Sequence, residues 1–271
     1  MKRHLSTLII ALVAICGTES AKAWTNYTHG TAAYIAEQHL TPEAKAKCHY
    51  YLKHTLPYYA SWMDAFRGAK DFYEVNRTHS GKTTADGKEY DFTIGKPKGG
   101  VAGHLIKALE ELGGGKYKNL PDSVVRQRLI NMAHYVPDMH CPVHILFPSS
   151  IHPIQKNMEL HKNGKEVSHH GFWDSFLGYD DRQSKWPYEK VASVIDILSE
   201  EEIKEIQKGT IEEWGKDIVE MGHRAYEILP QGTNVANLTK EQKDEMFQLV
   251  SKAVLYGGYR LAYILNTIFA E

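Results

Sequence analysis

The sequence lacks the motifs that mark the commonest nucleotide-binding and nucleophilic enzymes. It contains no Gly-x-Gly-x-x-Gly fingerprint, no P-loop, no Gly-x-Ser-x-Gly elbow and no Cys-x-x-Cys pair. No repeat period and no low-complexity tract interrupts its 271 residues. The sequence therefore does not indicate a dinucleotide-dependent enzyme, a serine hydrolase of that type, a thioredoxin-like protein or a repeat protein.

Cysteine is scarce, and neither sign of charge dominates. Only Cys48 and Cys141 follow the N-terminal segment, and they either form one disulfide or remain two buried thiols. Residues 24–271 carry 29 basic against 32 acidic side chains, a net charge of −3 at neutral pH. A chain of this charge is not a typical basic nucleic-acid binder, so any attraction for phosphate must come from a local feature such as bound metal.

Long hydrophobic runs are missing except at residues 5–16. That run follows two basic residues, is too short to span a membrane and leads to an Ala-Lys-Ala site at residues 21–23, which is typical of a secretory signal. A lipoprotein signal is the rival because Cys16 follows the apolar run, but the bulky Ile15 disfavours it. We predict that residues 1–23 are removed, that no membrane span remains, and that the protein is secreted or periplasmic.

Helical apolar spacing predominates from Trp24 onward. Thr41-Pro42-Glu43 has the capping side chain, early proline and early acid of a helix start, and Ser199 with Glu202 forms a capping box. We expect an all-α, single compact multi-helix domain over residues 24–271, with long loops and a small Asn-Gly hairpin within residues 158–167. The expected helices include residues 41–54, 58–66, 103–112, 199–229 and 238–270.

Metal-type ligands are densest in residues 134–144. His134 and Asp138 are four residues apart and would project from the same face of a helix. His144 lies further round a straight helix, but two prolines in the segment predict a kinked or tightened helix that turns it into the same cavity. The alternative is an ordinary histidine-rich helix. We prefer a metal site because the rest of the chain supplies more ligands.

Further carboxylates and histidines lie at similar spacing. His170 and Asp174 repeat the four-residue separation. Asp64 has apolar and aromatic neighbours, where a carboxylate is either buried and paired or bound to metal. Arg67 shares its helical face, so an Asp–Arg pair within the helix is the alternative.

Two candidates depend on the predicted cleavage site and on a loop. Cleavage before Trp24 would free an amine that forms a five-membered chelate with its own carbonyl, and His29 follows five residues later. His79 lies in the long loop of residues 69–100 and says little alone.

Taken in order, these residues resemble the zinc-dependent single-strand nuclease and 3′-nucleotidase family (the nuclease S-one/P-one type), in the zinc phospholipase C/nuclease superfamily. The shared pattern spans residues 24–174: Trp24, His29, Trp-x-Asp64-x-x-Arg67, His79, His134-x3-Asp138-x5-His144 and His170-x3-Asp174. The resemblance implies the family's all-helical fold and three Zn²⁺ ions. It implies that one zinc is held by Asp64, His79 and His134, another by Trp24 and His29, with Asp138 bridging these two, and the third by His144, His170 and Asp174.

The resemblance also implies a phosphodiesterase acting on single-stranded DNA or RNA and on 3′-nucleotides, leaving 5′-phosphates. Arg67, Asp64 and Asp138 would then be catalytic, with Arg67 holding a phosphoryl oxygen. Ser80 stands where the family has a base-stacking aromatic residue, and Tyr90 or Phe92 is the candidate replacement. A phospholipase C-like lipid phosphodiesterase with the same cluster and a non-catalytic zinc-binding helical protein are the alternatives. We expect a monomer.

Overall fold

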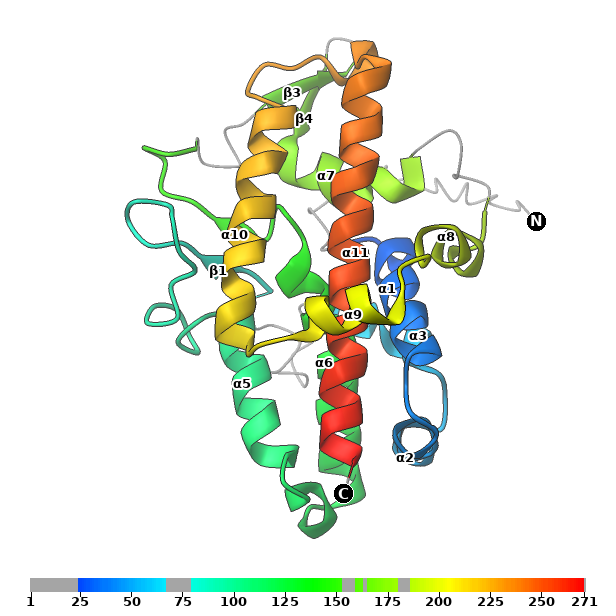
Figure 1. The fold of residues 1–271 in the computed structure, drawn as a ribbon. Helices are drawn as coiled ribbons and strands as arrows, with labels where there is room; N and C mark the ends of the chain where they lie inside the picture. Colours follow the sequence, from blue (N-terminus) through cyan, green and yellow to red (C-terminus); the bar gives the residue numbers. More distant parts are fainter. Residues whose placement is uncertain (1–23, 67–78, 153–158, 163–164, 180–185, 271) are drawn as a thin grey trace, which may run out of the picture.

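The computed structural model describes residues 24–66, 79–152, 159–162, 165–179 and 186–270. Figure 1 shows a mostly helical single domain, which confirms the predicted all-α fold. The predicted signal peptide lies outside the described residues. The α-helices are α1 (Asn26–Gln38), α2 (Pro42–Leu52), α3 (Leu56–Tyr59), α4 (Trp62–Ala65), α5 (Val101–Leu112), α6 (Asp122–His140), α7 (His169–Tyr179), α8 (Tyr188–Ile195), α9 (Glu200–Gln207), α10 (Ile211–Ile228) and α11 (Lys240–Phe269). Short 3₁₀ turns cover Lys116–Asn119 and Val235–Asn237, and the strands are β1 (Gly81–Lys82), β2 (Ile145–Leu146), β3 (Glu159–Lys162) and β4 (Lys165–Ser168).

Helix α11 packs against both α1 and α6, two of the helices that carry candidate ligands. Two glycines allow this close packing. A Cβ added at Gly258 would stand 2.9 Å from the carbonyl oxygen of Ala32 in α1, and one at Gly257 would touch the Cα of Pro137 in α6 at 3.4 Å. Because α11 contacts both helices, it fixes α1 relative to α6 and so sets the spacing of the ligands they carry.

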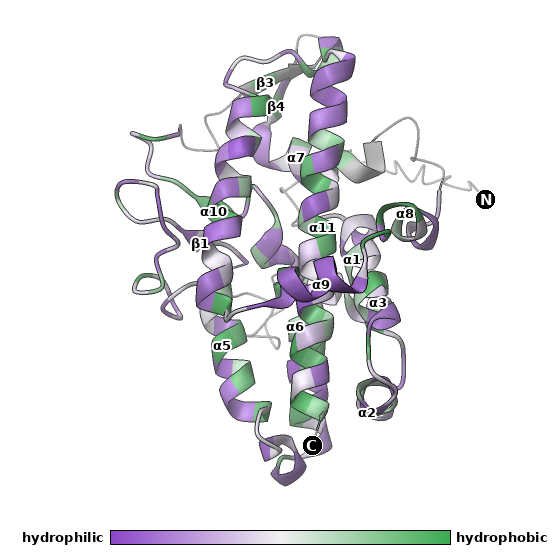
Figure 2. Ribbon diagram, in the orientation of Figure 1, coloured by the Kyte–Doolittle hydropathy of each residue, from purple (hydrophilic) through white to green (hydrophobic). Residues whose placement is uncertain are grey.

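The C-terminal helices are amphipathic. In Figure 2, hydrophilic and hydrophobic residues alternate along α10 and α11, as expected of helices with one face against a core. In α10 the buried positions recur every three or four residues, as at Ile211, Trp214, Ile218 and Met221. These two helices supply apolar packing, as their sequence pattern predicts.

The single helix predicted over residues 199–229 is wrong. The capping box at Ser199 is present, but α9 ends at Gln207 and α10 begins at Ile211. Between them Gly209 has a φ of 93°, a left-handed conformation that ends a helix. Thr210 then forms a second capping box with Glu213, which starts α10 in a new direction.

The helix predicted over residues 58–66 is also broken, into α3 and α4. In a continuous helix the Ala60 carbonyl would accept a hydrogen bond from the amide of residue 64. Instead it accepts one from the ring Nδ1 of His134, 2.7 Å away and fully buried. The break therefore releases a backbone acceptor that orients a histidine of α6.

Helix α6 continues through Pro137 and ends at His140, so the predicted kinked helix reaching His144 is wrong. His144 is reached by a turn, in which its amide donates to the Cys141 carbonyl at 3.0 Å. Strand β2 follows at once and pairs in parallel with β1, Gly81 opposite Ile145. A non-local strand pair, rather than the helix, therefore places His144.

The predicted hairpin is confirmed in its strands. β3 and β4 pair antiparallel, with Glu159 opposite Ser168 and Lys162 opposite Lys165, while its Asn-Gly turn lies outside the described residues. Helix α7 follows β4 directly and carries the His170/Asp174 pair. Among the helices that the structure describes, none combines the length and apolar character needed to cross a bilayer.

Candidate metal centre

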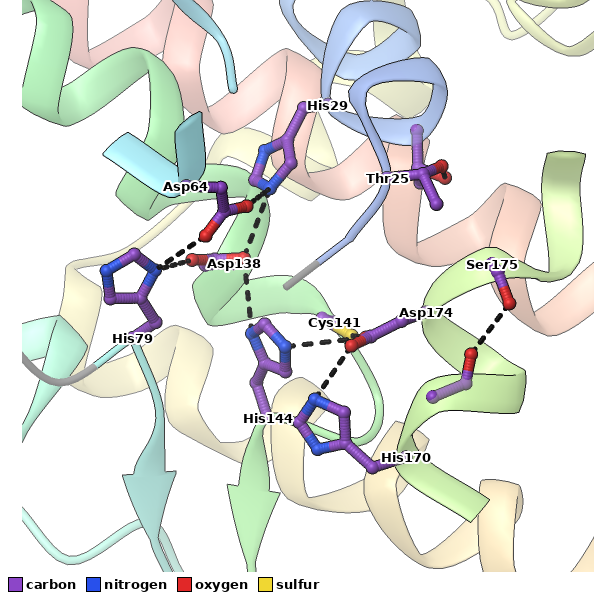
Figure 3. Close-up of polar contacts among 12 residues, drawn as sticks. Thr25, His29, Asp64, His79, Asp138, Cys141, His144, His170, Asp174 and Ser175 are labelled. Atoms are coloured by element: carbon purple, nitrogen blue, oxygen red, sulfur yellow. Dashed lines mark hydrogen bonds and ion pairs between the residues drawn. The ribbon is translucent and has the colours of Figure 1, made fainter. Parts of the chain in front are cut away.

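The first cluster of candidate ligands consists of His29, Asp64, His79, His134 and Asp138. The carboxylate of Asp138, on α6, is fully buried and lies at its centre (Figure 3). One of its oxygens is 3.0 Å from His134 Nε2 and 2.9 Å from His79 Nδ1. The other is 3.3 Å from His29 Nε2, which α1 presents. Histidines from α1, α6 and the segment before β1 therefore converge on one carboxylate.

Asp64 of α4 faces the same three histidines. Its oxygens lie 3.8 to 3.9 Å from a ring nitrogen of each. His134 Nδ1–H donates to the Ala60 carbonyl, which fixes the tautomer and leaves the Nε2 lone pair facing the carboxylates. That Nε2 is also 2.9 Å from His79 Nδ1. Two nitrogens and two carboxylates thus face a common centre, a donor set that suits zinc.

His144 connects this first cluster to a second one, which consists of His144, His170, Asp174 and Cys141. Its Nδ1 is 3.2 Å from an Asp138 oxygen, and its Nε2 is 3.4 Å from Asp174 Oδ1. Asp174 is buried and its Oδ2 is 2.7 Å from His170 Nε2. The predicted trio of His144, His170 and Asp174 therefore lies together, and the Cys141 thiol joins it with Sγ 3.4 Å from Asp174 Oδ1.

The two-residue β1–β2 ladder holds one histidine of each cluster. The amide of Gly81 donates to the His144 carbonyl at 2.9 Å, and that of Thr83 donates to Leu146 at 3.0 Å. His79 lies two residues before Gly81. The ladder therefore fixes His79 relative to His144, although 65 positions separate them in the sequence.

Several buried polar atoms in the clusters make no hydrogen bond with any described residue. They include both ring nitrogens of His29, both oxygens of Asp138, His144 Nδ1 and Asp174 Oδ2. Their short contacts are not aligned as hydrogen bonds, because the lone pairs point towards shared centres. Buried donors and acceptors are rarely left in this state, and a bound cation would satisfy them.

Two separations in the second cluster, 3.4 Å each from Asp174 Oδ1 to His144 Nε2 and to Cys141 Sγ, match those around zinc. With Zn–N and Zn–O bonds near 2.1 Å and Zn–S near 2.3 Å, neighbouring ligand atoms of a tetrahedron lie roughly 3.4 to 3.6 Å apart. Three groups each place one donor atom per residue within 4.8 Å of the others: His29/His134/Asp138, Asp64/His79/His134 and Cys141/His144/Asp174. Buried nitrogen, oxygen and sulfur donors at this spacing fit divalent metal ions.

The S1/P1 nuclease family matches the chain over residues 24–270. The chain belongs to the S1/P1 nuclease family. Endonuclease 1 of Arabidopsis thaliana is 20% identical to it, in an alignment covering 97% of this chain and 93% of that protein. Membership in a nuclease family implies a hydrolase.

Electrostatics in this S1/P1 nuclease favour a cation at Asp138. Burial alone would raise the pKa of Asp138, but His134 and His144 outweigh it and hold the pKa well below its usual range. Burial lowers the pKa of His29, and the neighbouring His134 lowers it further. An ionised carboxylate therefore stays buried among imidazoles, at least one of which resists protonation, and a metal ion can supply the positive charge this arrangement needs.

Trp24, the first described residue, lies beside both clusters. Its side chain is buried with the ring edge-on to His29, their centroids 6.4 Å apart. The next amide, that of Thr25, donates to the Asp174 carbonyl at 3.2 Å. The start of the predicted mature chain is thus held between the His29 ring of α1 and the backbone carbonyl of Asp174 in α7.

Three other residues singled out in the sequence, Ser80, Tyr90 and Phe92, belong to neither cluster. Arg67 lies outside the described residues. Ser80 joins His79 to β1, and its carbonyl accepts from Val101 at 3.2 Å. Tyr90 does not replace the missing stacking aromatic, because its ring is 6% exposed and its hydroxyl donates to Gly99. Phe92 is only partly buried, but it packs against Tyr90 with centroids 4.5 Å apart.

Cys141 is the residue of the centre that the sequence did not reveal. A disulfide between Cys48 and Cys141 is one alternative left open by the sequence, and the structure has both as free, buried thiols. Burial raises the pKa of each thiol to about 12. Their local sequences do not distinguish them, and only the approach of α7 to the end of α6 places Cys141 beside Asp174.

Removing metal is expected to destabilise the fold, because the ligands join α1, α4, α6, α7 and the segments just before β1 and β2. A bound ion at a thousandfold excess over its Kd contributes about 4 kcal/mol per site. Treatment with EDTA should therefore lower Tm, measured by calorimetry, by roughly 10 °C for each ion removed from a chain of this size. Added Zn²⁺ should restore the original value and Mg²⁺ should not. An unchanged Tm, with metal loss verified by elemental analysis, would contradict a structural contribution from metal.

Proposed function

We propose that the protein is an exported, zinc-dependent phosphodiesterase that hydrolyses single-stranded DNA, RNA and 3′-nucleotides to leave 5′-phosphates. The supporting observation is the convergence of buried histidines on Asp138, joined through His144 to Asp174. Family membership supports a nuclease rather than a structural zinc protein. The match begins at Trp24, which agrees with removal of residues 1–23 during export to a secreted or periplasmic location.

The proposed ligand sets follow the family pattern. One zinc would be held by Asp64, His79 and His134, and a second by His29 with the amine and carbonyl of Trp24, Asp138 bridging both. His144, His170 and Asp174 would hold a third. When bound, zinc would supply Lewis-acid activation of water and of a phosphoryl oxygen.

The chain's own residues have defined tasks in this proposal. Asp138, fully buried, keeps the ligand histidines at a fixed separation. Ala60 holds His134 in one tautomer through its carbonyl, so the imidazole needs no rearrangement during turnover. Arg67 would donate hydrogen bonds to a non-bridging phosphoryl oxygen as negative charge builds up there, which is the geometry for which a guanidinium is suited.

Local charge would attract the substrate despite the acidic chain. Residues 24–271 carry a net charge of −3. Three zinc ions together with Asp64, Asp138 and Asp174 would give the centre a charge of about +3. A positive cleft on an acidic protein draws a phosphodiester to one place and leaves the remaining surface unattractive to nucleic acid.

A phospholipase C-like lipid phosphodiesterase with the same metal cluster is the second candidate. By resemblance, those enzymes carry Glu where this chain has Asp174, and Asp64-x-x-Arg67 is part of the nuclease pattern. Both features favour the nuclease. Burial of Tyr90 leaves base recognition without its expected aromatic partner, so preference among bases is expected to be weak.

The decisive experiment assays zinc-loaded protein on matched single-stranded and duplex DNA, RNA, a 3′-nucleotide and phosphatidylcholine. Single strands should be cut at least roughly tenfold faster than duplex, because taking a base out of a duplex costs a few kcal/mol. A 3′-nucleotide should release inorganic phosphate. Hydrolysis of phosphatidylcholine without nucleic-acid cleavage would replace the nuclease by the lipid enzyme, and equal rates on single and double strands would contradict single-strand selectivity.

A further inference from the structure

The thiol of Cys141 lies inside the second cluster. It follows the last residue of α6, is fully buried, and places Sγ 3.4 Å from Asp174 Oδ1 (Figure 3). Its sulfur, a His144 nitrogen and an Asp174 oxygen all lie within 4.8 Å of one another. Asp174 and His144 are each at most 3% exposed, and Asp174 Oδ2 makes no hydrogen bond with a described residue.

These separations suit coordination to a single ion. The 3.4 Å from Sγ to Asp174 Oδ1 and the 3.4 Å from His144 Nε2 to the same oxygen fall near the ligand–ligand spacing of a zinc tetrahedron, roughly 3.4 to 3.6 Å. Cys48 is the internal comparison. It is equally buried and free, but it belongs to none of the metal-type groups among the described residues. Burial of cysteine in this fold therefore does not by itself bring a thiol to a ligand cluster.

We propose that Cys141 is a protein ligand, as the thiolate, of the metal ion held by His144, His170 and Asp174. On binding, the Sγ–metal bond forms and the thiol proton passes to the buffer. One sulfur, two nitrogens and one oxygen would complete a tetrahedral shell supplied by the protein. Such a site selects zinc, cadmium or cobalt over magnesium and calcium, because thiolate is a soft ligand. The identity of the metal rests on the proposed function, whereas the ligand assignment rests on the cluster.

A thiolate would add a fourth protein ligand to the three that the family pattern supplies. The second-cluster ion should therefore be retained more firmly than those at Asp138. The zinc of this site would also join the end of α6 to α7. In the other cluster the proposed ligand set includes no thiolate and relies on the chain terminus.

Cobalt substitution tests the assignment through a signal that does not depend on turnover. A thiolate bound to Co²⁺ gives an intense near-ultraviolet charge-transfer band that imidazole and carboxylate do not give. The apo-protein reconstituted with Co²⁺ should show this band at the intensity of a single thiolate. Cys141→Ser should abolish the band, and the matched control Cys48→Ser should retain it. A band missing from the wild type at full cobalt loading, or one that persists in Cys141→Ser, overturns the proposal.

A second measurement uses zinc retention. Under stepwise addition of a chelator, the wild type and Cys48→Ser should keep one zinc after the others have left, whereas Cys141→Ser should release all of them over the same range. Cys141→Ala, with circular dichroism to verify folding, replaces the serine variant if that variant misfolds. Release of every zinc together from the wild type counts against the assignment. Nuclease activity without the cobalt band would support the proposed function and refute Cys141 as a ligand. The band without nuclease activity would support Cys141 as a ligand and refute the proposed function.

Discussion

Replacing Asp138 with asparagine is expected to abolish catalysis and remove zinc from the first cluster. The carboxylate is fully buried and contacts His29, His79, His134 and His144 at 2.9 to 3.3 Å. Asparagine keeps the size but loses the charge, and its amide would present hydrogens to lone pairs that a cation should meet. Removing one partner from a buried charged network costs roughly 3–5 kcal/mol of folding stability. Loss of the bound metal would also remove its stabilisation of developing charge, so activity should fall about a thousandfold or more.

The measurement pairs zinc content by elemental analysis with the rate on single-stranded DNA. Asp196→Asn is the matched control, because Asp196 also contacts a histidine, His39, at 2.9 Å but lies outside the clusters. It should keep its zinc and most of its activity. Normal zinc content and near-normal activity in Asp138→Asn would show that the carboxylate only organises the helix.

The second large effect concerns the N-terminus. Protein produced without export, as Met followed by Trp24, is expected to lose one zinc and most of its activity. A free α-amine has an unperturbed pKa near 8, so zinc can bind it uncharged close to neutral pH, whereas the amide formed by an added residue has no comparable lone pair. Trp24 is buried against His29, and Thr25 is bonded to Asp174, so the end of the mature chain lies where a ligand is needed.

The comparison requires two preparations whose N-termini are established by mass spectrometry, one cleaved after Ala23 and one carrying the extra methionine. Zinc stoichiometry and nuclease rate should differ between them. A fusion protein from which a protease exposes Trp24 serves as the control, because it should regain the zinc held by Trp24 and His29 in the absence of export. Equal stoichiometry and equal rates would remove Trp24 from the ligand set and leave it a buried aromatic anchor.

Local sequence signals predicted the helix starts well. Thr41 caps α2 by accepting from the Ala44 amide at 3.2 Å, and the predicted capping box at Ser199 is formed. Helix continuity was harder to predict. Apolar periodicity predicts one helix through Gly209, but this glycine ends α9. The break before α4 involves the bond from the His134 ring to the Ala60 carbonyl, and these two residues are 74 positions apart in the sequence.

The candidate site likewise has one part that local sequence predicts and another that depends on long-range contacts. The spacing of His134/Asp138 and His170/Asp174 is local, so their joint projection follows from helical periodicity, and His134 lies beside Asp138 as expected. His144 depends on pairing between β1 and β2, and Cys141 depends on the packing of α7. Strands of two residues are too short to be predicted from the sequence. Tertiary contacts alone determine that Cys141, and not Cys48, lies in the second cluster.

The docking of α11 has a consequence for the order of assembly. Every proposed ligand precedes α8 in the chain, so all of them are synthesised before the helix that sets the distance between α1 and α6. At Gly257 and Gly258 that helix packs closely against Pro137 of α6 and Ala32 of α1, so both helices must be in place before it docks. We therefore expect the spacing between the ligands of α1 and α6 to be completed only when the C-terminal helix packs against both. A chain truncated before α11 is accordingly expected to bind metal more weakly than the full chain, although it contains every proposed ligand.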